Sequence, residues 1–348
     1  MSNLKFKNLT KLKKGDCVAI ISPSFAAPGA WPQVYELGLE RVRDVFGLKP
    51  TETPTTKRIG STTADRTKDL INVFQDSDIK AVITTLGGDD QVTYVNNLPS
   101  EPFSNNPKPF FGYSDNTHLI NFLWLSGVPS FYGGALFTEF AEQKKISDFT
   151  TKYLKHALFD SGEIELLQSP EFNDEGLDWG DLANLTKQRR YQKNEGWYWD
   201  GRNNTEGITW GGCLESIGEM LMAGVKIPTL EQFSDVVLFI ETSEGMPSAS
   251  EVFHVFRALG ERGILERVKG VLVGRPKAWE FDNQRSDREK DEYKLEQRNI
   301  IIEFVRKYNS NIPIIQNMDF GHTSPQIPLP VGKKATINSD DKRIFIEF

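Results

Sequence analysis

The chain has 348 residues, more than one hydrophobic core usually supports, and this length predicts two domains. Hydrophobic residues make up 38% and charged residues 26% of the chain, as in ordinary globular proteins. Lys and Arg total 41 against 48 Asp and Glu, for a net charge of −7 without a basic stripe. This balance argues against nucleic acid as a partner.

The N-terminal segment is basic but has no pattern of a signal peptide. Its apolar run, Cys17 to Ile21, is shorter than a signal-peptide core and has no small-residue cleavage site. No run approaches the roughly 18 apolar residues that a membrane span needs. The two cysteines, Cys17 and Cys213, match no metal-binding or redox spacing. We therefore expect a cytoplasmic protein with reduced thiols and no membrane partner.

Strands and helices alternate along the first part of the chain, predicted to be an N-terminal domain over residues 1–165. Apolar runs predict strands at 17–22, 80–88 and 109–114. Apolar residues at helical spacing predict helices at 31–47, 64–78 and 114–127. This alternation is typical of a parallel sheet covered by helices on both faces.

The pattern fails between about Ser169 and Glu206, a polar stretch rich in Gly and Asn that contains Trp179, Trp197 and Trp199. Long stretches without periodicity tend to be functional or to act as linkers. We interpret residues 166–206 as an inserted loop that crosses between domains, with its aromatic side chains partly buried or lining a cleft.

A second domain is predicted over residues 207–348. Its strands are expected at 207–212, 236–241 and 269–276, with further short strands near the C-terminus. Its helices are expected from about 214, near 248–262 and near 288–308. The mixture is less regular than in the first half.

The stretch KPFFGYSDNTHL places Ser114 where a buried strand turns into a helix. Such a turn lifts a hydroxyl above the sheet edge, near backbone N–H groups that can stabilise an oxyanion. The alternative is that Ser114 only caps the helix, since serine is a preferred N-cap residue.

A serine nucleophile needs a base, and the chain has four histidines. His118, His156 and His254 occupy helical positions typical of packed or surface side chains. His322 differs because it lies in a loop bounded by Gly321 and Pro325, and loops often carry catalytic groups. We therefore choose His322.

A third group should orient the imidazole and stabilise its cation. Glu241 ends the apolar run VVLFI and should lie at a strand's C-terminal edge, whereas Glu244 falls in the following turn. We choose Glu241, although a helix-start or surface acid is the alternative. Gly88, in TTLGGDD, is the candidate second oxyanion donor because glycine permits close backbone approach, although a plain turn explains it equally well.

These segments together resemble the serine peptidase family of LD-carboxypeptidases over nearly the whole chain. The motifs that carry the resemblance, in order, are SPS (22–24), TLGGDD, FFGYSD, FYGG (131–134), GGCLESI (211–217), LFIE and GHTSPQIPLPVG. The resemblance implies a Ser114–His322–Glu241 triad and an oxyanion hole from the N–H groups of Asp115 and Gly88. It also implies a flavodoxin- or amidotransferase-like α/β domain, a β-rich α+β second domain, an active site between them and a homodimer.

The GGDD turn, the inserted loop and HTSP resemble the microcin-C self-immunity branch of this family. In that branch a loop tryptophan stacks on a nucleobase, which implies this role for Trp179, and Asp89 is expected to contact substrate. The immunity proteins carry basic residues shortly after the catalytic glutamate, whereas this chain has TSEGMPS. Recognition of the same phosphoramidate nucleotide is therefore not implied.

The predicted function is amide hydrolysis, without metal or organic cofactor, of a small peptide or aminoacyl-nucleotide. A murein tetrapeptide carboxypeptidase of cell-wall recycling is the alternative. A kinase is a more remote one, because LGGDD resembles the GGDG turn of NAD and lipid kinases, but Asp90 and Gln91 replace their Gly-Thr. A kinase would also leave His322 and Ser114 without a role. A non-catalytic small-molecule binding protein is a further alternative, against which a complete triad in the expected order argues.

Overall fold

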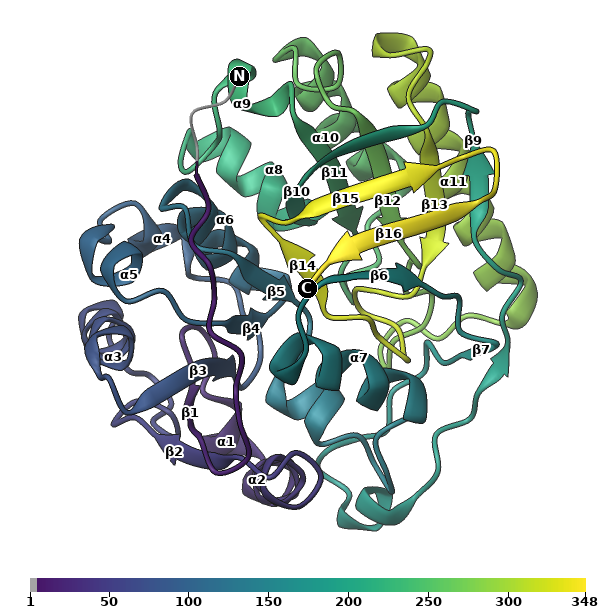
Figure 1. Ribbon diagram of the computed structural model, residues 1–348. Coiled ribbons are helices and arrows are strands. Elements are labelled where there is room, and N and C mark those ends of the chain that lie inside the picture. The colour runs from purple at the N-terminus through teal and green to yellow at the C-terminus, as the bar shows by residue number, and fades with distance from the viewer. Residues whose placement is uncertain (1–4) are drawn as a thin grey trace.

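Two β-sheets lie side by side in the computed structural model, which describes residues 5–348 (Figure 1). The first four residues of the predicted N-terminal domain lie outside the described residues. The first sheet has six strands, and all neighbours are parallel except the last pair, β5 and β14. In spatial order the strands are β2 (Lys49–Glu52), β1 (Cys17–Ile21), β3 (Ile79–Thr84), β4 (Phe110–Gly112), β5 (Ser130–Tyr132) and β14 (Leu329–Val331).

Helices cover this sheet, as the alternation predicts. They are α1 (Ala27–Ala30), α2 (Pro32–Asp44), α3 (Thr63–Gln75), α4 (Val92–Val95), α5 (Glu101–Asn105), α6 (Thr117–Leu125), α7 (Asp148–Phe159) and the single-turn elements η1 (Ser114–Asn116) and η2 (Leu136–Phe140). The α3 helix begins where the Thr62 side chain accepts the Asp65 N–H, which satisfies one free donor of the first turn. The α3 helix packs on β1 and β3, and α6 packs on β4 and β5.

The second sheet has eight strands around a parallel centre, β10 to β13. In order they are β6 (Glu163–Leu166), β16 (Arg343–Glu347), β15 (Lys334–Asn338), β10 (Thr205–Cys213), β11 (Val236–Glu241), β12 (Gly270–Gly274), β13 (Ile314–Met318) and β9 (Tyr198–Asp200). The helices are α8 (Leu214–Ala223), α9 (Leu230–Phe233), α10 (Ala249–Glu261) and α11 (Asp287–Tyr308). Capping boxes that begin at Ser248 and Ser286 start α10 and α11. The α/β region followed by a β-rich region confirms the predicted fold class.

Each sheet contains one strand that comes from the other part of the chain. The late strand β14 pairs with β5 of the first sheet, with Leu329 opposite Tyr132. The earlier strand β6 pairs with the C-terminal strand β16 of the second sheet. The boundaries drawn at 165/166 and 206/207 stay a prediction, but the two sheets are joined by more than one connection.

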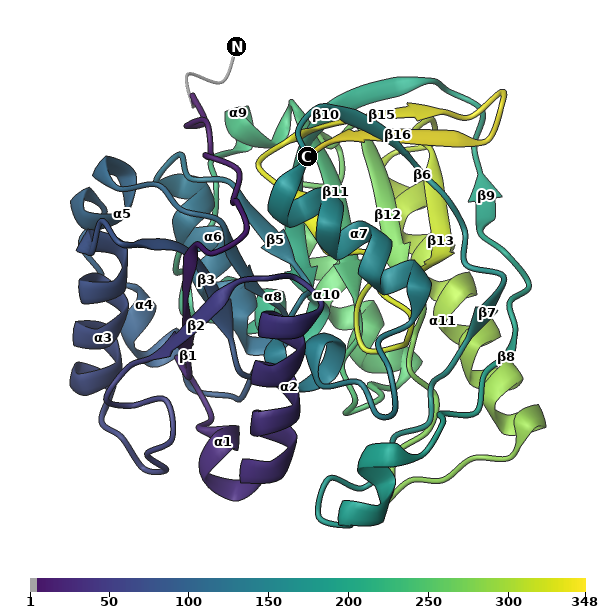
Figure 2. The ribbon, with the colours of Figure 1, turned by 60° about the horizontal axis from the view of Figure 1, so that its bottom comes forward.

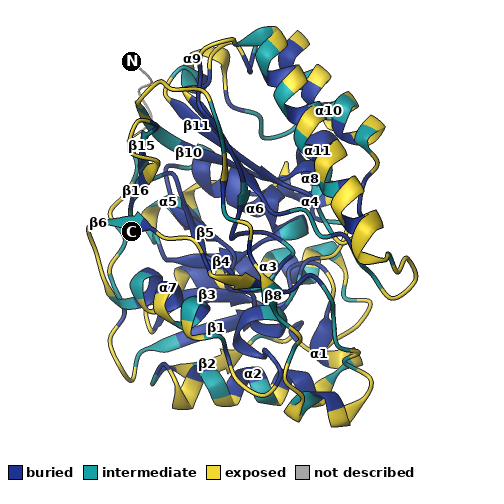
Figure 3. Ribbon diagram, turned by 90° about the vertical axis from the view of Figure 1, so that its right-hand side faces the viewer, coloured by how far each residue is buried: buried dark blue, intermediate teal, exposed yellow. Residues whose placement is uncertain are grey.

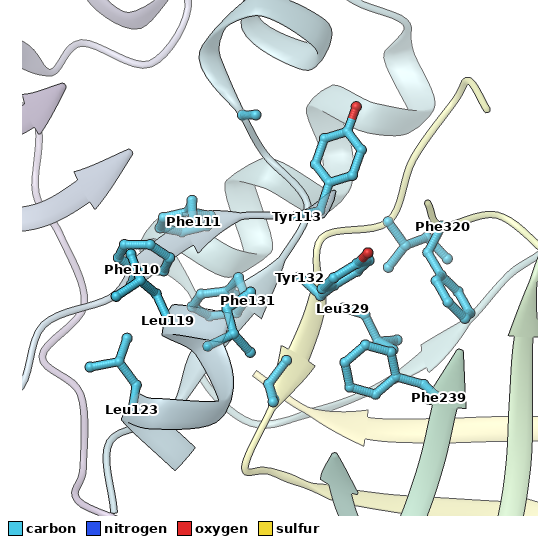
Figure 4. Close-up of a cluster of buried hydrophobic side chains, with 14 of the residues drawn as sticks. Phe110, Phe111, Tyr113, Leu119, Leu123, Phe131, Tyr132, Phe239, Phe320 and Leu329 are labelled. Atoms are coloured by element: carbon cyan, nitrogen blue, oxygen red, sulfur yellow. The ribbon is translucent and has the colours of Figure 1, made fainter. Parts of the chain in front are cut away.

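A buried aromatic cluster fills the junction between the sheets (Figure 4). Phe111 and Phe131 stack with ring centroids 4.7 Å apart in the first sheet. Tyr132 extends the cluster to Phe239 of β11, at 5.2 Å between centroids. The buried residues run continuously from one sheet into the other (Figure 3). This packing holds β5 of the first sheet against β11 of the second.

The inserted loop, residues 166–206, runs along the outer edge of the second sheet, where β9 pairs with β13 (Figure 2). It contains the short elements β7 (Glu171–Phe172), η3 (Leu182–Thr186) and β8 (Gln192–Lys193) before β9. Trp197 is buried and its indole N–H donates to the Asp319 carboxylate at 2.9 Å. Trp197 therefore anchors this loop. Within residues 5–348, no helix combines the length and apolar character needed to span a bilayer.

Candidate active site

Ser114 stands at a strained turn directly after β4. Its φ of 63° lies in the left-handed region, which side-chain-bearing residues rarely adopt. The hydroxyl makes no capping hydrogen bond, since neither η1 nor α6 has a side-chain cap. The Ser114 carbonyl accepts from the Thr117 hydroxyl at 2.6 Å. The interpretation as a helix cap is therefore wrong, and strain of this kind gathers at functional sites.

His322 and Glu241 form a close pair. His322 Nδ1 lies 2.7 Å from Glu241 Oε2, and the His322 backbone N–H donates to the same oxygen at 3.2 Å. Glu241 is fully buried at the end of β11. A Cβ on Gly321, whose φ is +96°, would lie 2.5 Å from that oxygen, so a glycine is required before the histidine. These contacts fix the ring orientation through Nδ1.

Tyr132, at the end of β5, connects this pair to the strained serine. Its hydroxyl donates a short hydrogen bond to Glu241 Oε1 and accepts the Ser114 N–H at 3.3 Å. The sequence motif FYGG contains this tyrosine, but nothing in the motif assigns it a role. Burial and the Glu241 charge raise the pKa of Tyr132, so the phenol keeps its proton and continues to donate.

The other ring nitrogen of His322 contacts the acid that we did not choose. His322 Nε2 lies 3.0 Å from Glu244 Oε2. Burial alone would lower the pKa of His322, but the charges of Glu241 and Glu244 outweigh it and raise this pKa well above its usual range. The His322 charge in turn lowers the pKa of Glu244 to about 2. Two carboxylates thus flank the ring and favour its protonated form.

The TTLGGDD turn lies against Ser114 through Gly87. A Cβ on Gly87 would be 2.8 Å from Ser114 Cβ and 3.3 Å from the Asp115 nitrogen, so this turn approaches Ser114 closely. Gly88, with φ +154°, packs against Ser24 and lines one cavity with Gly87 and Ser114. Within residues 5–348, neither the Gly88 N–H nor the Asp115 N–H donates a backbone hydrogen bond outside the helices and strands. The close packing of Gly87 was not foreseen.

The Asp115 side chain serves a different cluster. Its carboxylate lies 3.5 Å from His118 Nε2, which is also 3.2 Å from Glu219 Oε2. These three residues form the one group of His, Cys, Asp or Glu that could hold a metal ion within residues 5–348. Burial raises the pKa of Asp115. His118 is packed, as predicted for a helical position.

A cavity of about 530 Å³ opens over Ser114 and His322. Its lining comes from both sheets and from the inserted loop, including Gly88, Tyr113, Glu139, Arg189, Glu244 and Gln326. Burial raises the pKa of Glu139 to about 7. A volume of this size is typical of small-molecule sites.

Trp179 and Asp89, the two expected substrate contacts, lie in different places. Trp179 lines the cavity half-buried, with its ring edge-on to Trp31 at 5.2 Å and to Phe137 at 5.4 Å. Asp89 is exposed and lines a smaller neighbouring pocket of about 110 Å³. Trp179 therefore both packs against two aromatic rings and lines the cavity, whereas Asp89 does not line the main cavity.

Known proteins with similar sequences and structures fit this arrangement. The model of the LD-carboxypeptidase N-terminal domain matches residues 18–133, and that of the C-terminal domain matches residues 206–337. The microcin C7 self-immunity protein MccF of Escherichia coli is 27% identical over 82% of this chain and 78% of its own length. The crystal structure of an MccF-like protein from Bacillus anthracis superposes with a TM-score of 0.84, at 27% identity, over 97% of this chain and 98% of its own. An MccF-like protein from Streptococcus pneumoniae in complex with AMP superposes with a TM-score of 0.82, at 25% identity, over 95% and 98%.

The two family models match separate parts of the chain, and residues 134–205 between them include η2, α7, β6 and most of the inserted loop. The first model contains Ser114 and the second contains Glu241 and His322. The protein therefore belongs to the LD-carboxypeptidase family of serine-type carboxypeptidases.

Proposed function

We propose that this enzyme hydrolyses an amide bond in a small peptide or aminoacyl-nucleotide, with Ser114 as nucleophile, His322 as base and Glu241 as the group that orients it. The observation that carries the proposal is the convergence of a strained Ser114 and the His322–Glu241 pair on one cavity. A nucleophile, a base and an orienting acid in this order are the constellation of serine hydrolases.

In the proposed mechanism, neutral His322 removes the Ser114 proton at Nε2 while the hydroxyl attacks the scissile carbonyl. The N–H groups of Asp115 and Gly88 bind the developing oxyanion. The imidazolium then protonates the leaving nitrogen, and the amide bond breaks to give an ester on Ser114. Water, deprotonated by the same ring, attacks this ester and releases the acid and free Ser114.

The substrate class is supported by the relatives and by the cavity. The Escherichia coli relative is named for self-immunity to microcin C7, and the pneumococcal structure holds AMP. An aromatic face at Trp179 within the cavity suits a nucleobase. A murein tetrapeptide is the alternative substrate, and the predicted homodimer can be tested by light scattering.

Labelling with a serine-reactive fluorophosphonate tests the nucleophile directly. We expect mass spectrometry to find the label on Ser114 and the Ser114→Ala variant to be inert. The same enzymes are then assayed with an aminoacyl sulfamoyl-adenosine and a murein tetrapeptide. The proposal fails if the variant keeps near-native turnover of a substrate that the wild type cleaves. Circular dichroism serves as the folding control.

A further inference from the structure

Glu244 occupies a fixed place at the mouth of the cavity. It follows β11 in a short turn, and its side chain is 55% exposed although it contacts the buried ring of His322. Glu215, at the start of α8, accepts both the N–H and the hydroxyl of Ser243, at 3.0 and 2.6 Å. The turn is therefore held in place from a neighbouring element, and the position of Glu244 is set by the fold.

The contact between Glu244 and His322 opposes the proposed base role. The base must present an unprotonated Nε2 to Ser114, but Glu244 stabilises a proton on that nitrogen. The groups that face the ring are Glu241 at Nδ1, Glu244 at Nε2 and the Tyr113 ring at 4.9 Å between centroids. None of them competes for Glu244, so at neutral pH a group that draws this carboxylate away favours the free base of His322.

Other carboxylates of the cavity already have partners. Three of them form ion pairs with lysine ammonium groups: Glu280, Asp174 and Glu175. Two accept backbone N–H groups: Glu139 and Asp178. Within residues 5–348, Glu244 forms an ion pair with His322 alone, although the nearby charge of Lys277 also lowers its pKa. The two cations of the cavity also have partners. Arg189 donates to Gln143 and Ser324, and Lys277 forms an ion pair with Glu280. Glu244 is thus the cavity carboxylate that is available to pair with a cationic group of a ligand.

We propose that Glu244 recognises an ammonium group of the substrate, and that this group, by taking over the carboxylate, releases Nε2 of His322 to serve Ser114. The inference rests on the proposed function. Glu244 Oε2 lies 3.0 Å from Nε2, and Nε2 must reach the reacting atoms by a hydrogen bond of similar length, so the ammonium binds within roughly 6 Å of the scissile bond. An α-ammonium group or a lysine side chain of the acyl residue meets this condition. An anionic or apolar group leaves Glu244 paired with His322.

Four lysyl sulfamoyl-adenosines distinguish these sources: unmodified, α-acetylated, ε-acetylated and doubly acetylated. We expect acetylation of the recognised ammonium to lower the wild-type kcat/KM at neutral pH about tenfold, the scale of a hydrogen bond between charged groups. Glu244→Gln should react with all four probes at rates within about twofold of one another. Glu175→Gln is the matched control, because it removes a cavity carboxylate that contacts Lys290 and not His322. It should keep the wild-type preference.

A binding measurement decides the inference independently of turnover. With Ser114→Ala, calorimetry should show about tenfold tighter binding of the unmodified probe than of the doubly acetylated one. Adding Glu244→Gln should remove this difference. Equal binding of both probes by Ser114→Ala, or a preference that survives in Glu244→Gln, overturns the inference. If the wild type binds with the expected preference but cleaves no probe, the proposed function fails for this substrate class while the recognition role stands.

Discussion

Replacing Glu244 by Gln should shift the acid limb of the pH profile for hydrolysis to lower pH. The side chain keeps its shape but loses its charge, so the carboxylate 3.0 Å from His322 Nε2 no longer stabilises the imidazolium. The pKa of His322 is raised in the wild type, which means that the free base is populated only at higher pH. Removing one of the two acids lowers this pKa. More of the enzyme is then competent on the acid side of the profile.

The magnitude follows from the exposure of the pair. Glu244 is 55% exposed, so solvent screens the interaction and limits its free energy to about 1 kcal/mol, as for surface ion pairs. Since 1.36 kcal/mol corresponds to a factor of ten, kcat/KM on the acid limb should rise about fivefold. The alkaline plateau should stay unchanged, because both enzymes carry neutral His322 there.

The assay uses the doubly acetylated probe, so that substrate recognition by Glu244 does not contribute. We would measure kcat/KM from about pH 5 to 9, which reports the free-enzyme titration of the base. The gain should shrink at high salt, which screens the exposed pair. Superimposable acid limbs for the two enzymes, or a limb displaced to higher pH in Glu244→Gln, would refute the reasoning.

Three further substitutions test the surroundings of the site. Gly87→Ala places a methyl group 2.8 Å from Ser114 Cβ, so kcat/KM should fall about a hundredfold by misplacement of the hydroxyl, with little change in melting temperature; native activity would show that the turn yields. Tyr132→Phe leaves the buried Glu241 oxygen without its donor and should lower the free energy of unfolding in urea by about 1–3 kcal/mol, whereas no loss would mean that water replaces the hydroxyl. Trp179→Ala should weaken kcat/KM for aminoacyl sulfamoyl-adenosines about ten- to a hundredfold and scarcely affect a murein tetrapeptide. Equal losses on both substrates would make Trp179 structural.

Much of the fold follows from local patterns in the sequence. The predicted strands at 17–22 and 236–241 and the helices at 31–47 and 64–78 are present with shifts of only a few residues. Their apolar spacing and caps act within a few residues, so they can be read without knowledge of the rest. The pairing of β14 with β5 joins residues almost two hundred positions apart and has no local signal. Short strands such as β2, which is largely exposed, carry too few apolar residues to be recognised.

The candidate site shows the same division. Ser114, Glu241 and His322 could be chosen because a strand end, a glycine and a loop each mark a position. The structure places Ser114 and His322 on one cavity and pairs Glu241 with His322, while the triad stays a proposal. Sequence position alone placed Glu244 as a rival of Glu241. The two acids in fact contact opposite nitrogens of one ring, a relation that depends on the rotation of that ring. Tyr132 was missed because its partners are remote in sequence.

The loop that carries His322 is attached to both sheets. Before the histidine, β13 lies in the second sheet, and buried Asp319 forms an ion pair with Arg275 at 2.7 Å. After it, β14 is paired in the first sheet. The segment that carries His322 is therefore fixed at both ends, once in each sheet. A hinge motion that separated the two sheets would have to break the hydrogen bonds between β14 and β5. The inserted loop supplies part of the cavity lining without carrying Ser114, Glu241 or His322, so its sequence can vary while the geometry of these three residues is kept.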